Sequence, residues 1–322
     1  MLNNQDFTQE RQKYLGGSDI GAILGLSKYR SPVDVWLEKT GKRNNPINSL
    51  PLRFGQFAEA FVASEYALAT QVHLVQHDGA IIHPEYSFFQ SHIDRFIVHP
   101  GQNLFNTEGK LQAHKILECK TANPFAQSEW GEKGTDQVPL IYVVQCLWYM
   151  ILTGIDATDL AVLFGNTDFR IYKIYRDLEL ESLLLEKTLH FWQHHVQKDI
   201  PPAAQSEQDF RHLFQKATKH QSIEATENIY QQIQEFHRQQ YSLQQIEDQM
   251  SLIKQDLMGY LQEAEVLTYQ GQILATWKSP KPSTRWDTKQ LGLDHPELTA
   301  LYQIPIQNSR RLLIKEQKEG QI

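Results

Sequence analysis

The chain has few cysteines and no long run of apolar residues. Only Cys119 and Cys146 occur among 322 residues, too few for a disulfide framework or for a four-cysteine zinc or iron–sulfur site. No apolar run reaches the ~18 residues of a membrane span. The first residues, MLNNQDFTQERQKYL, lack the basic and then apolar order of a secretory signal. We therefore expect a cytoplasmic protein with no membrane partner.

Motifs for nucleotide hydrolysis and for zinc hydrolases are also missing. Neither G-x-x-x-x-G-K-[ST] nor G-x-G-x-x-G occurs, so no glycine loop for phosphates of ATP or of a dinucleotide is encoded. His190 and His194 are four residues apart but lack the glutamate of H-E-x-x-H. We interpret this pair as part of an aromatic packing helix.

The net charge is −7, which does not by itself indicate a nucleic-acid-binding protein. Apolar residues make up 41% and charged residues 21%, as in ordinary folded proteins. Basic residues nevertheless cluster near the N-terminus, whereas much of the acid lies after residue 176. The clustered residues are Lys28, Arg30, Lys39, Lys42, Arg43 and Arg53. A local basic surface can therefore exist on an acidic protein.

The pattern of elements predicts an α/β fold: a mixed central sheet flanked by helices. Glycine, proline and helix-capping residues divide residues 18–200 into helices, strands, a helix, strands and a helix. The expected elements are a helix capped by Ser18, a helix from Ser31 to Gly41, a helix over 53–70, strands within 72–98 including FFQSHIDRFIV, a polar loop over 99–114, a strand over 115–122, a helix from Pro139 to Gly154, and two strands around a Gly-Asn turn within 159–177.

The composition changes after residues 199–208, which indicates a second region. Residues 223–262 are rich in glutamine and carry apolar residues every three or four positions, so we expect one long helix or a two-helix hairpin there. A β-hairpin turning at Gly271 and a final basic strand over 309–315 follow. We predict a domain over 1–204 and a C-terminal extension over 205–322.

The strand ILECKTA, residues 116–122, places an acid and a base two positions apart. Side chains of a strand alternate between faces, so Glu118 and Lys120 share one face while Cys119 lies on the other. A lone pair of this kind is most often a surface ion pair worth about 0 to 1 kcal/mol. The acids that precede the strand favour a different reading.

Asp94 lies in an apolar stretch where an unpaired carboxylate is costly. A hairpin from 94 to 118 would bring it beside Glu118, and two neighbouring carboxylates favour a divalent cation such as Mg²⁺ or Mn²⁺. Lys120 would face the same cavity and could stabilise charge on a phosphate. The trio predicts a site for metal-assisted hydrolysis, with Asp78 and Glu108 as alternative acids.

Four blocks of sequence, in order, resemble the phage-type viral recombinase nucleases, the family of lambda exonuclease and the YqaJ-like proteins. Asp94 and Glu118-x-Lys120 also match the short D-(x)n-(D/E)-x-K signature of the restriction-endonuclease-like fold. The blocks are RQKYLGGSDIGAILGLSKYRSPVDVWLEKTG (11–41), RFGQFAEAFVASEY (53–66), ILECKTA (116–122) and VPLIYVVQCLWYMILTG (138–154). The resemblance covers residues 10–200 and implies a restriction-endonuclease-like nuclease domain. It departs from the family in two places: SHID stands in place of the proline that many relatives carry before the aspartate, and the loop 99–114 is longer and more polar than a tight hairpin.

The resemblance also implies roles for individual residues. Asp94 and Glu118 become metal ligands with the backbone carbonyl of Cys119, and Lys120 becomes the catalytic lysine. Glu59 matches the helical acid that helps to hold a second metal. Without the family resemblance, a solvated surface glutamate would explain this residue equally well. Gln145 matches the family's glutamine beside the lysine.

Two further residues match positions that contact DNA phosphate in the family. Arg11 offers a guanidinium suited to phosphate. Ser18, in GGSD, stands where glycines allow close backbone approach and a helix N-terminus offers amide donors, although a plain helix cap explains it equally well.

The resemblance implies a Mg²⁺-dependent deoxyribonuclease, with Mn²⁺ able to substitute, that resects double-stranded DNA from a 5′ end. A single-strand annealing recombinase would be a partner, and a homo-oligomer is possible. Two alternatives stay open from the sequence. The same site could make internal cuts as an endonuclease, or the chain could be an inactive DNA-binding or scaffold module.

Overall fold

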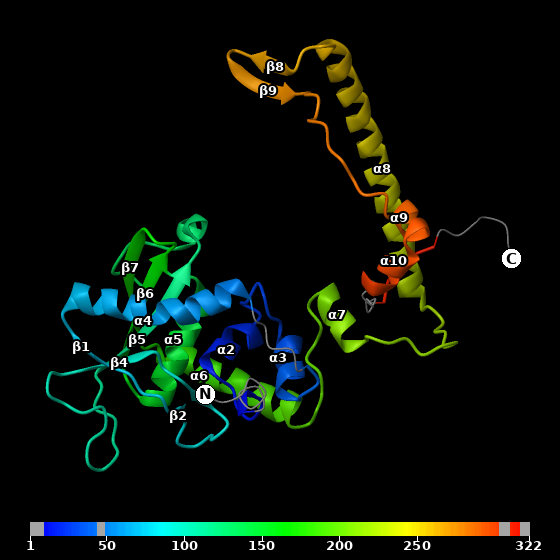
Figure 1. Cartoon of the computed structure of the whole chain (residues 1–322). Helices are drawn as coiled ribbons and strands as arrows, with labels where there is room; N and C mark the ends of the chain where they lie inside the picture. Colours follow the sequence, from blue (N-terminus) through cyan, green and yellow to red (C-terminus); the bar gives the residue numbers. More distant parts are fainter. Residues whose placement is uncertain (1–9, 44–48, 303–309, 316–322) are drawn as a thin grey trace. The chain divides into compact units, whose positions relative to one another are not determined.

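The computed structural model describes residues 10–43, 49–302 and 310–315 (Figure 1). The chain divides into two compact units, residues 1–213 and 214–322, which are described separately below. The division lies beyond residue 204, the boundary expected from composition. Helix α7 (Glu207–Leu213) joins the first unit because Asp209 accepts a hydrogen bond from the Ser31 hydroxyl at 2.5 Å.

The first unit is built on a five-stranded mixed sheet with the order β1-β4-β5-β6-β7. Strands β5 and β6 are parallel, whereas the other neighbours are antiparallel. The strands are β1 His73–Val75, β4 Arg95–Val98, β5 Lys115–Ala122, β6 Ala157–Phe164 and β7 Asp168–Tyr175, with a separate pair β2 Ile81–Ile82 and β3 Gln90–Ser91. The predicted α/β fold with a mixed central sheet is confirmed.

Helices cover both faces of this sheet. Helix α4 packs on one face, and α5 packs on the other together with α2 and α6 (Figure 1). The helices of this unit are α2 Gly17–Ile23, α3 Pro32–Lys39, α4 Leu50–Thr70, a 3-10 turn Pro124–Glu129, α5 Leu140–Thr153, α6 Leu178–His190 and a π-helical turn Phe191–Val196, followed by α7. The helices over 53–70 and 139–154 and the capped helix at Ser31 are therefore confirmed.

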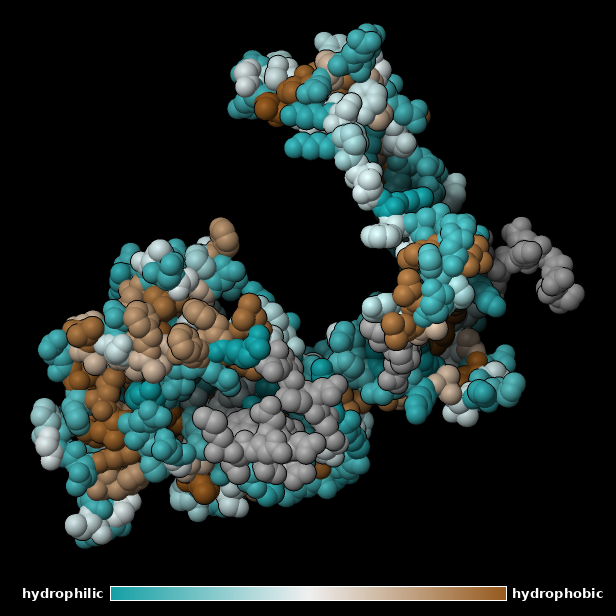
Figure 2. All heavy atoms as spheres, in the orientation of Figure 1, coloured by the Kyte–Doolittle hydropathy of each residue, from teal (hydrophilic) through white to brown (hydrophobic). Residues whose placement is uncertain are grey.

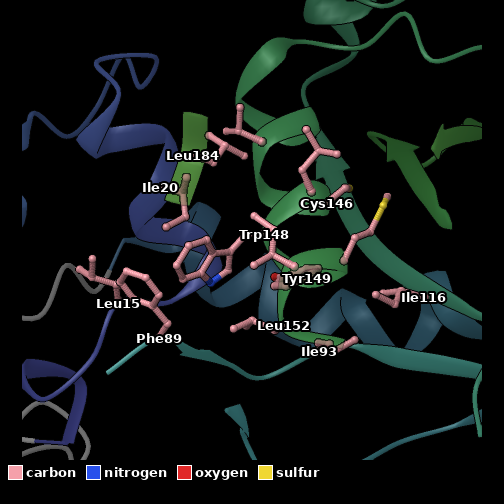
Figure 3. Close-up of a cluster of buried hydrophobic side chains, with 14 of the residues drawn as sticks. Leu15, Ile20, Phe89, Ile93, Ile116, Cys146, Trp148, Tyr149, Leu152 and Leu184 are labelled. Atoms are coloured by element: carbon pink, nitrogen blue, oxygen red, sulfur yellow. The ribbon is translucent and has the colours of Figure 1, made fainter. Parts of the chain in front are cut away.

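Helix α5 forms the centre of the larger core. Nearly every residue of its second half is buried, as the continuous apolar sequence predicts. Figure 3 shows the ring of Phe89 beside Trp148, with Ile20 and Leu15 nearby, and the rings of Phe89 and Trp148 have centroids 4.8 Å apart. Gly154, at φ 73°, ends the helix in the left-handed conformation that glycine favours.

Glycines let α2 approach α5 closely. A Cβ atom at Gly17 would lie 2.6 Å from Cε1 of Tyr149, and one at Gly21 would overlap the side chain of Ile141. Any larger residue at these two positions would force the helices apart. The glycines therefore hold the start of the chain against the helix that follows the central strand.

Helix α4 has apolar residues on two faces. Its inner face packs Val62, Ala63 and Tyr66 against the sheet. Its outer face exposes large apolar side chains, and Figure 2 shows hydrophobic atoms gathered along the helix. The exposed residues are Leu50, Leu52, Phe54, Phe57, Phe61 and Leu68.

Two details of the first unit differ from the sequence-based expectation. The first helix is capped by Gly16, not by Ser18, because the Asp19 carboxylate accepts the Gly16 N–H at 3.1 Å and fixes the start of the helix two residues earlier. The stretch FFQSHIDRFIV is not one strand but contributes to β3 and β4, with Asp94 directly before β4.

The second unit contains one long helix, α8 (Glu227–Leu261), so the helical-hairpin alternative is wrong. The predicted hairpin follows as β8 (Val266–Tyr269) and β9 (Gln272–Thr276), with Gly271 at φ 81° in its turn. Two short helices, α9 Thr288–Asp294 and α10 Pro296–Tyr302, were not expected.

The final basic strand is not observed where it can be checked, because residues 310–315 form no regular element. Residue 309, where that strand was expected to begin, lies outside the described residues. No helix in the described parts of the chain is long and apolar enough to cross a membrane.

Candidate active site

The register of β4 and β5 brings Asp94 to Glu118. Arg95 pairs with Leu117 and Phe96 with Ile116 in this antiparallel ladder, so the position before Arg95 lies opposite Glu118. The backbone N–H of Cys119 donates a hydrogen bond to Oδ2 of Asp94 at 2.8 Å. The predicted convergence of the two carboxylates is therefore observed.

Glu118 is the centre of the cluster. The residue is 1% exposed, and its Oε1 atom contacts both the Lys120 ammonium at 2.5 Å and the side-chain amide of Gln145 at 2.7 Å. Its Oε2 atom is also buried, and among the described residues it accepts no hydrogen bond. One oxygen of the carboxylate is thus fixed by two donors, and the other keeps its capacity for a ligand.

Strand alternation explains why these groups meet. Ile116, two residues before Glu118, packs into the α5-side core, whereas Leu117 and Cys119 pack into the α4-side cluster. Glu118 and Lys120 therefore both face α5. Their shared face, predicted from the sequence alone, is confirmed.

Helix α5 supplies the remaining polar groups. Gln145 also contacts the hydroxyl oxygen of Tyr149 at 2.7 Å, one helical turn further along. The ring of Tyr142 lies 6.0 Å from the Lys120 ammonium, within the range of a weak cation–π contact. A buried amide in an apolar helix needs such partners, so the position of Gln145 agrees with the expectation from the sequence. Tyr149 was not predicted as part of the site, because a tyrosine in an apolar helix is typical of the hydrophobic core.

The cluster shifts the protonation of its members. Burial and the neighbouring Glu118 carboxylate hold the pKa of Asp94 well above its usual range. Burial lowers the pKa of Lys120, but the carboxylates of Glu118 and Asp94 outweigh it and raise that pKa overall. Lys120 is therefore an ammonium at neutral pH. Burial also raises the pKa of the Cys119 thiol, so this side chain is a neutral apolar group.

Glu59 lies near the cluster but has its own partner. Its carboxylate accepts a hydrogen bond from the Arg95 guanidinium at 2.8 Å, and its charge contributes to the raised pKa of Asp94. Arg95 was not predicted as part of the site, although its position directly after Asp94 was a visible clue. The structure thus places Glu59 next to the cluster and pairs it with a cation.

Arg11 and Ser18 meet beside a buried acid. Arg11 donates to the Ser18 hydroxyl at 3.1 Å and lies 3.3 Å from Oδ1 of Asp19. Asp19 is completely buried and also contacts Arg30 at 3.0 Å and Lys39 at 2.7 Å. Burial raises the pKa of Asp19, but these three cations outweigh it and hold that pKa far below its usual range.

The three cations around Asp19 face two carboxylates, because Arg30 also pairs with Glu38 at 2.5 Å, so one positive charge is in excess here even though the protein is acidic. Arg11, whose side chain is 38% exposed, is the cation of the three that reaches solvent most. The sequence identified Arg11, Ser18 and the basic cluster, but the buried position of Asp19 could not be read from it.

The two alternative acids lie elsewhere. Asp78 accepts a weak hydrogen bond from Gln76 at 3.4 Å, and Glu108 is exposed at the tip of the 99–114 loop. Asp94 is the acid that faces Glu118, so neither alternative is needed.

The cluster contains too few side chains for a complete metal site by itself. Within residues 10–43, 49–302 and 310–315, no group of three or more histidine, cysteine, aspartate or glutamate side chains could hold an ion. Asp94 and Glu118 nevertheless fit a divalent cation, because both are hard oxygen donors, they repel each other, and Oε2 of Glu118 has no hydrogen-bond donor within the described residues. A backbone carbonyl and water would complete such a site.

The arrangement combines two carboxylates that fit a divalent cation with a fixed ammonium. Groups of this kind stabilise the negative charge that develops on a phosphate during hydrolysis.

Comparisons with known proteins agree with the sequence. Residues 6–156 match the model of the YqaJ-like viral recombinase domain, which confirms the family resemblance stated above. The uncharacterized protein YqaJ of Bacillus subtilis strain 168 is 28% identical over 306 residues, which make up 92% of this chain and 90% of that protein. The matched segment contains every residue of the candidate site.

Two solved structures resemble the chain more distantly. An alkaline exonuclease from Laribacter hongkongensis has a TM-score of 0.46 and 15% identity, covering 61% of this chain and 93% of its own. A phage-related exonuclease from Haemophilus somnus 129PT has a TM-score of 0.40 and 13% identity, covering 58% and 95%.

Proposed function

We propose that the chain, whose residues 6–156 match the model of the YqaJ-like viral recombinase domain, is a divalent-metal-dependent deoxyribonuclease. The observation that carries this proposal is the cluster of Asp94, Glu118, Lys120 and Gln145. Two carboxylates, an ammonium and an amide meet at one end of the β4–β5 ladder. A structural ion pair requires only one acid and one base, and burying a second acid beside them is costly. Metal-dependent phosphodiester hydrolysis, by contrast, uses two acids, a base and a polar group that orients them.

Asp94, Glu118 and the Cys119 carbonyl would hold Mg²⁺, and Mn²⁺ would substitute because it accepts the same oxygen ligands. Glu59 would assist a second ion if it left Arg95. The bound ion would supply Lewis acidity towards the scissile phosphate.

The side chains of the protein have separate tasks. Lys120, charged at neutral pH because of Glu118 and Asp94, donates hydrogen bonds to the attacking water or to the phosphate oxygens. Gln145 fixes Oε1 of Glu118, so that the carboxylate keeps one orientation while the substrate binds.

Arg11 and Ser18 would hold the DNA through its backbone. A guanidinium and a hydroxyl side by side suit a phosphate oxygen and read no base edge. Binding should therefore be independent of sequence and sensitive to salt.

Resection of double-stranded DNA in the 5′→3′ direction is the favoured activity, with a single-strand annealing recombinase as the partner that uses the product. Assembly into a homo-oligomer is part of this proposal. Internal cutting with the same site is the second candidate.

A time course on end-labelled linear duplex and on covalently closed circular duplex tests the proposal. With Mg²⁺ we expect loss of the linear duplex and survival of the circle. Degradation of the circle would show an endonuclease. A linear duplex labelled at one 5′ end or at one 3′ end reports the polarity. Absence of cleavage with both Mg²⁺ and Mn²⁺, while DNA still binds, would favour the scaffold alternative.

A further inference from the structure

A pocket lies on the face of the sheet opposite to Glu118 and Lys120. Helix α4 covers β5 and β6 on this face through Val62, Ala63 and Tyr66. Beyond Tyr66 the helix ends at Thr70, and Phe169 and Ile171 of β7 are only partly buried. A cavity of about 580 Å³ lies there, within the ~300 to 1,000 Å³ usual for sites of small ligands.

A buried carboxylate lies in the wall of this pocket. Asp159 of β6 is 4% exposed and accepts a hydrogen bond from the Tyr66 hydroxyl at 2.5 Å. The Lys115 ammonium lies 3.1 Å from its Oδ1 atom and 3.2 Å from Oδ2, where it donates a hydrogen bond. Among the described residues Oδ1 accepts no hydrogen bond. Asp159 is therefore held by Tyr66 and Lys115, and the Lys115 ammonium keeps donors for a ligand, because an ammonium has three.

Two more lysines line the pocket. Lys133 comes from the loop before α5 and Lys173 from β7, and both are exposed. Lys133 makes only a long ion pair of 3.7 Å with Asp168, an acid that the Arg170 guanidinium already holds at 2.7 Å. Within the described residues Lys173 has no ion pair shorter than 4 Å. The lysines of the pocket therefore carry more positive charge than Asp159 neutralises.

These features define the chemistry of a ligand. It has an anionic group for Lys133 and Lys173, a flat apolar part for Phe169 and Ile171, and an oxygen acceptor for Lys115. A nucleotide has all three: a phosphate, a base and sugar oxygens. We propose that this pocket binds a nucleotide at a site separate from the Glu118 cluster. The choice of a nucleotide among anionic ring compounds rests on the proposed nuclease function, because that reaction would release or hold nucleotides beside the protein.

The position of the pocket bears on its role. Leu117 and Cys119, whose neighbours Glu118 and Lys120 form the cluster, point to the α4 side of β5. A ligand in the pocket therefore lies across the thickness of the sheet from the cluster and does not share its cavity. The ligand could be a released mononucleotide or the terminal nucleotide of a strand, which offer the same phosphate, sugar and base.

Calorimetric titration of the full chain with thymidine 5′-monophosphate in EDTA tests the proposal. Chelation removes any binding through a metal at the Glu118 cluster. We expect Lys133→Gln and Lys173→Gln each to weaken binding about fivefold, as the loss of one charge contact at a partly exposed site implies. Lys120→Ala and the matched control Lys187→Gln, an exposed lysine of α6, should bind as the wild type does.

The ligand series separates the contributions of its parts. Thymidine and inorganic phosphate should each bind more weakly than thymidine 5′-monophosphate, because each lacks one part of the ligand. Tighter binding of a 5′-phosphorylated hexathymidylate would identify a strand end as the source, and equal or weaker binding would identify the free nucleotide.

Three results would overturn the nucleotide pocket: no binding at millimolar concentration, equal binding of thymidine, or a loss caused by Lys120→Ala but not by Lys173→Gln. The titration involves no cleavage. A chain that binds the nucleotide without cutting DNA would therefore count against the proposed nuclease activity alone.

Discussion

The ammonium of Lys120 lies 2.5 Å from Oε1 of Glu118, and both residues come from one face of β5. The contact links an acid and a base that are two positions apart in sequence, so the strand itself sets their separation. Because the two groups are in direct contact, the effects of changing them should be non-additive.

Lys120→Ala should abolish most cleavage and leave DNA binding intact. Loss of one charge that stabilises the transition state lowers the rate ~10²- to 10³-fold. DNA binding should persist because Arg11, which we expect to contact the DNA backbone, does not belong to β5. Single-turnover cleavage in Mg²⁺ and equilibrium binding in EDTA measure the two effects. A variant that cuts at the wild-type rate would refute the assignment, and Lys187→Ala serves as the control for loss of a lysine.

Glu59→Ala should reduce cleavage less than Glu118→Ala. Glu118 is buried and contacts both Lys120 and Gln145, whereas Glu59 pairs with Arg95 at the edge of the cluster. Rates for both variants over a series of Mg²⁺ concentrations give the comparison, with the glutamine replacements as controls for lost volume. Equal losses would mean that the two carboxylates have the same importance.

Mg²⁺ or Mn²⁺ should stabilise the wild-type protein against heat. At about ten times its Kd an ion that binds only the folded chain adds about 1.4 kcal/mol, which corresponds to a rise in Tm of about 3 to 5 °C. Asp94→Asn should lose this rise. The same variant should melt higher than the wild type in EDTA, because it removes one of two carboxylates that repel each other in a buried site. Differential scanning calorimetry with and without the ion is the measurement, and an equal response of both proteins to Mg²⁺ would contradict a metal site at Asp94.

Asp19→Asn should destabilise the protein at neutral pH by about 3 kcal/mol, because it leaves three cations near a buried neutral amide. The pKa of Asp19 is lowered in the folded state by Lys39, Arg11 and Arg30, against the effect of burial. Its stabilisation is therefore fully present above the unfolded pKa of about 3.9 and is lost as the pH falls below that value.

The difference in free energy of unfolding between wild type and Asp19→Asn should accordingly be largest near pH 7 and shrink below pH ~4. Urea unfolding at a series of pH values measures it. Parallel profiles for the two proteins would show that Asp19 does not titrate as this environment requires.

Much of the fold follows from local sequence features. Ser31 with Pro32, the apolar run before Gly154, and the alternation in ILECKTA each specify an element through interactions within a few residues. The start of α2 was missed because the carboxylate that accepts the Gly16 N–H belongs to Asp19, which Arg11 and Lys39 hold in place. A contact of that kind depends on residues 11 and 39, which no local pattern connects.

Some features of the candidate site likewise follow from local sequence, whereas others depend on how distant elements pack. The shared face of Glu118 and Lys120 follows from strand period, and the approach of Asp94 follows from a hairpin, so both could be predicted. The Arg95–Glu59 pair and the contact of Gln145 with Tyr149 depend on how α4 and α5 lie on the sheet. The pocket at Asp159 was not anticipated either, because Lys115, Lys133 and Lys173 are far apart in sequence and meet only through the sheet.

The alternation of β5 also protects the site from folding errors. A slip of one residue against its neighbours would turn Glu118 and Lys120 into the apolar layer under α4 and present Leu117 and Cys119 to α5 instead. Burying two uncompensated charges in that layer would destabilise the fold far more than the hydrogen bonds of a shifted ladder could stabilise it. Misaligned chains should therefore fail to complete the sheet at all, so a cell would hold either competent molecules or unfolded ones, with few well-folded but inert copies between them.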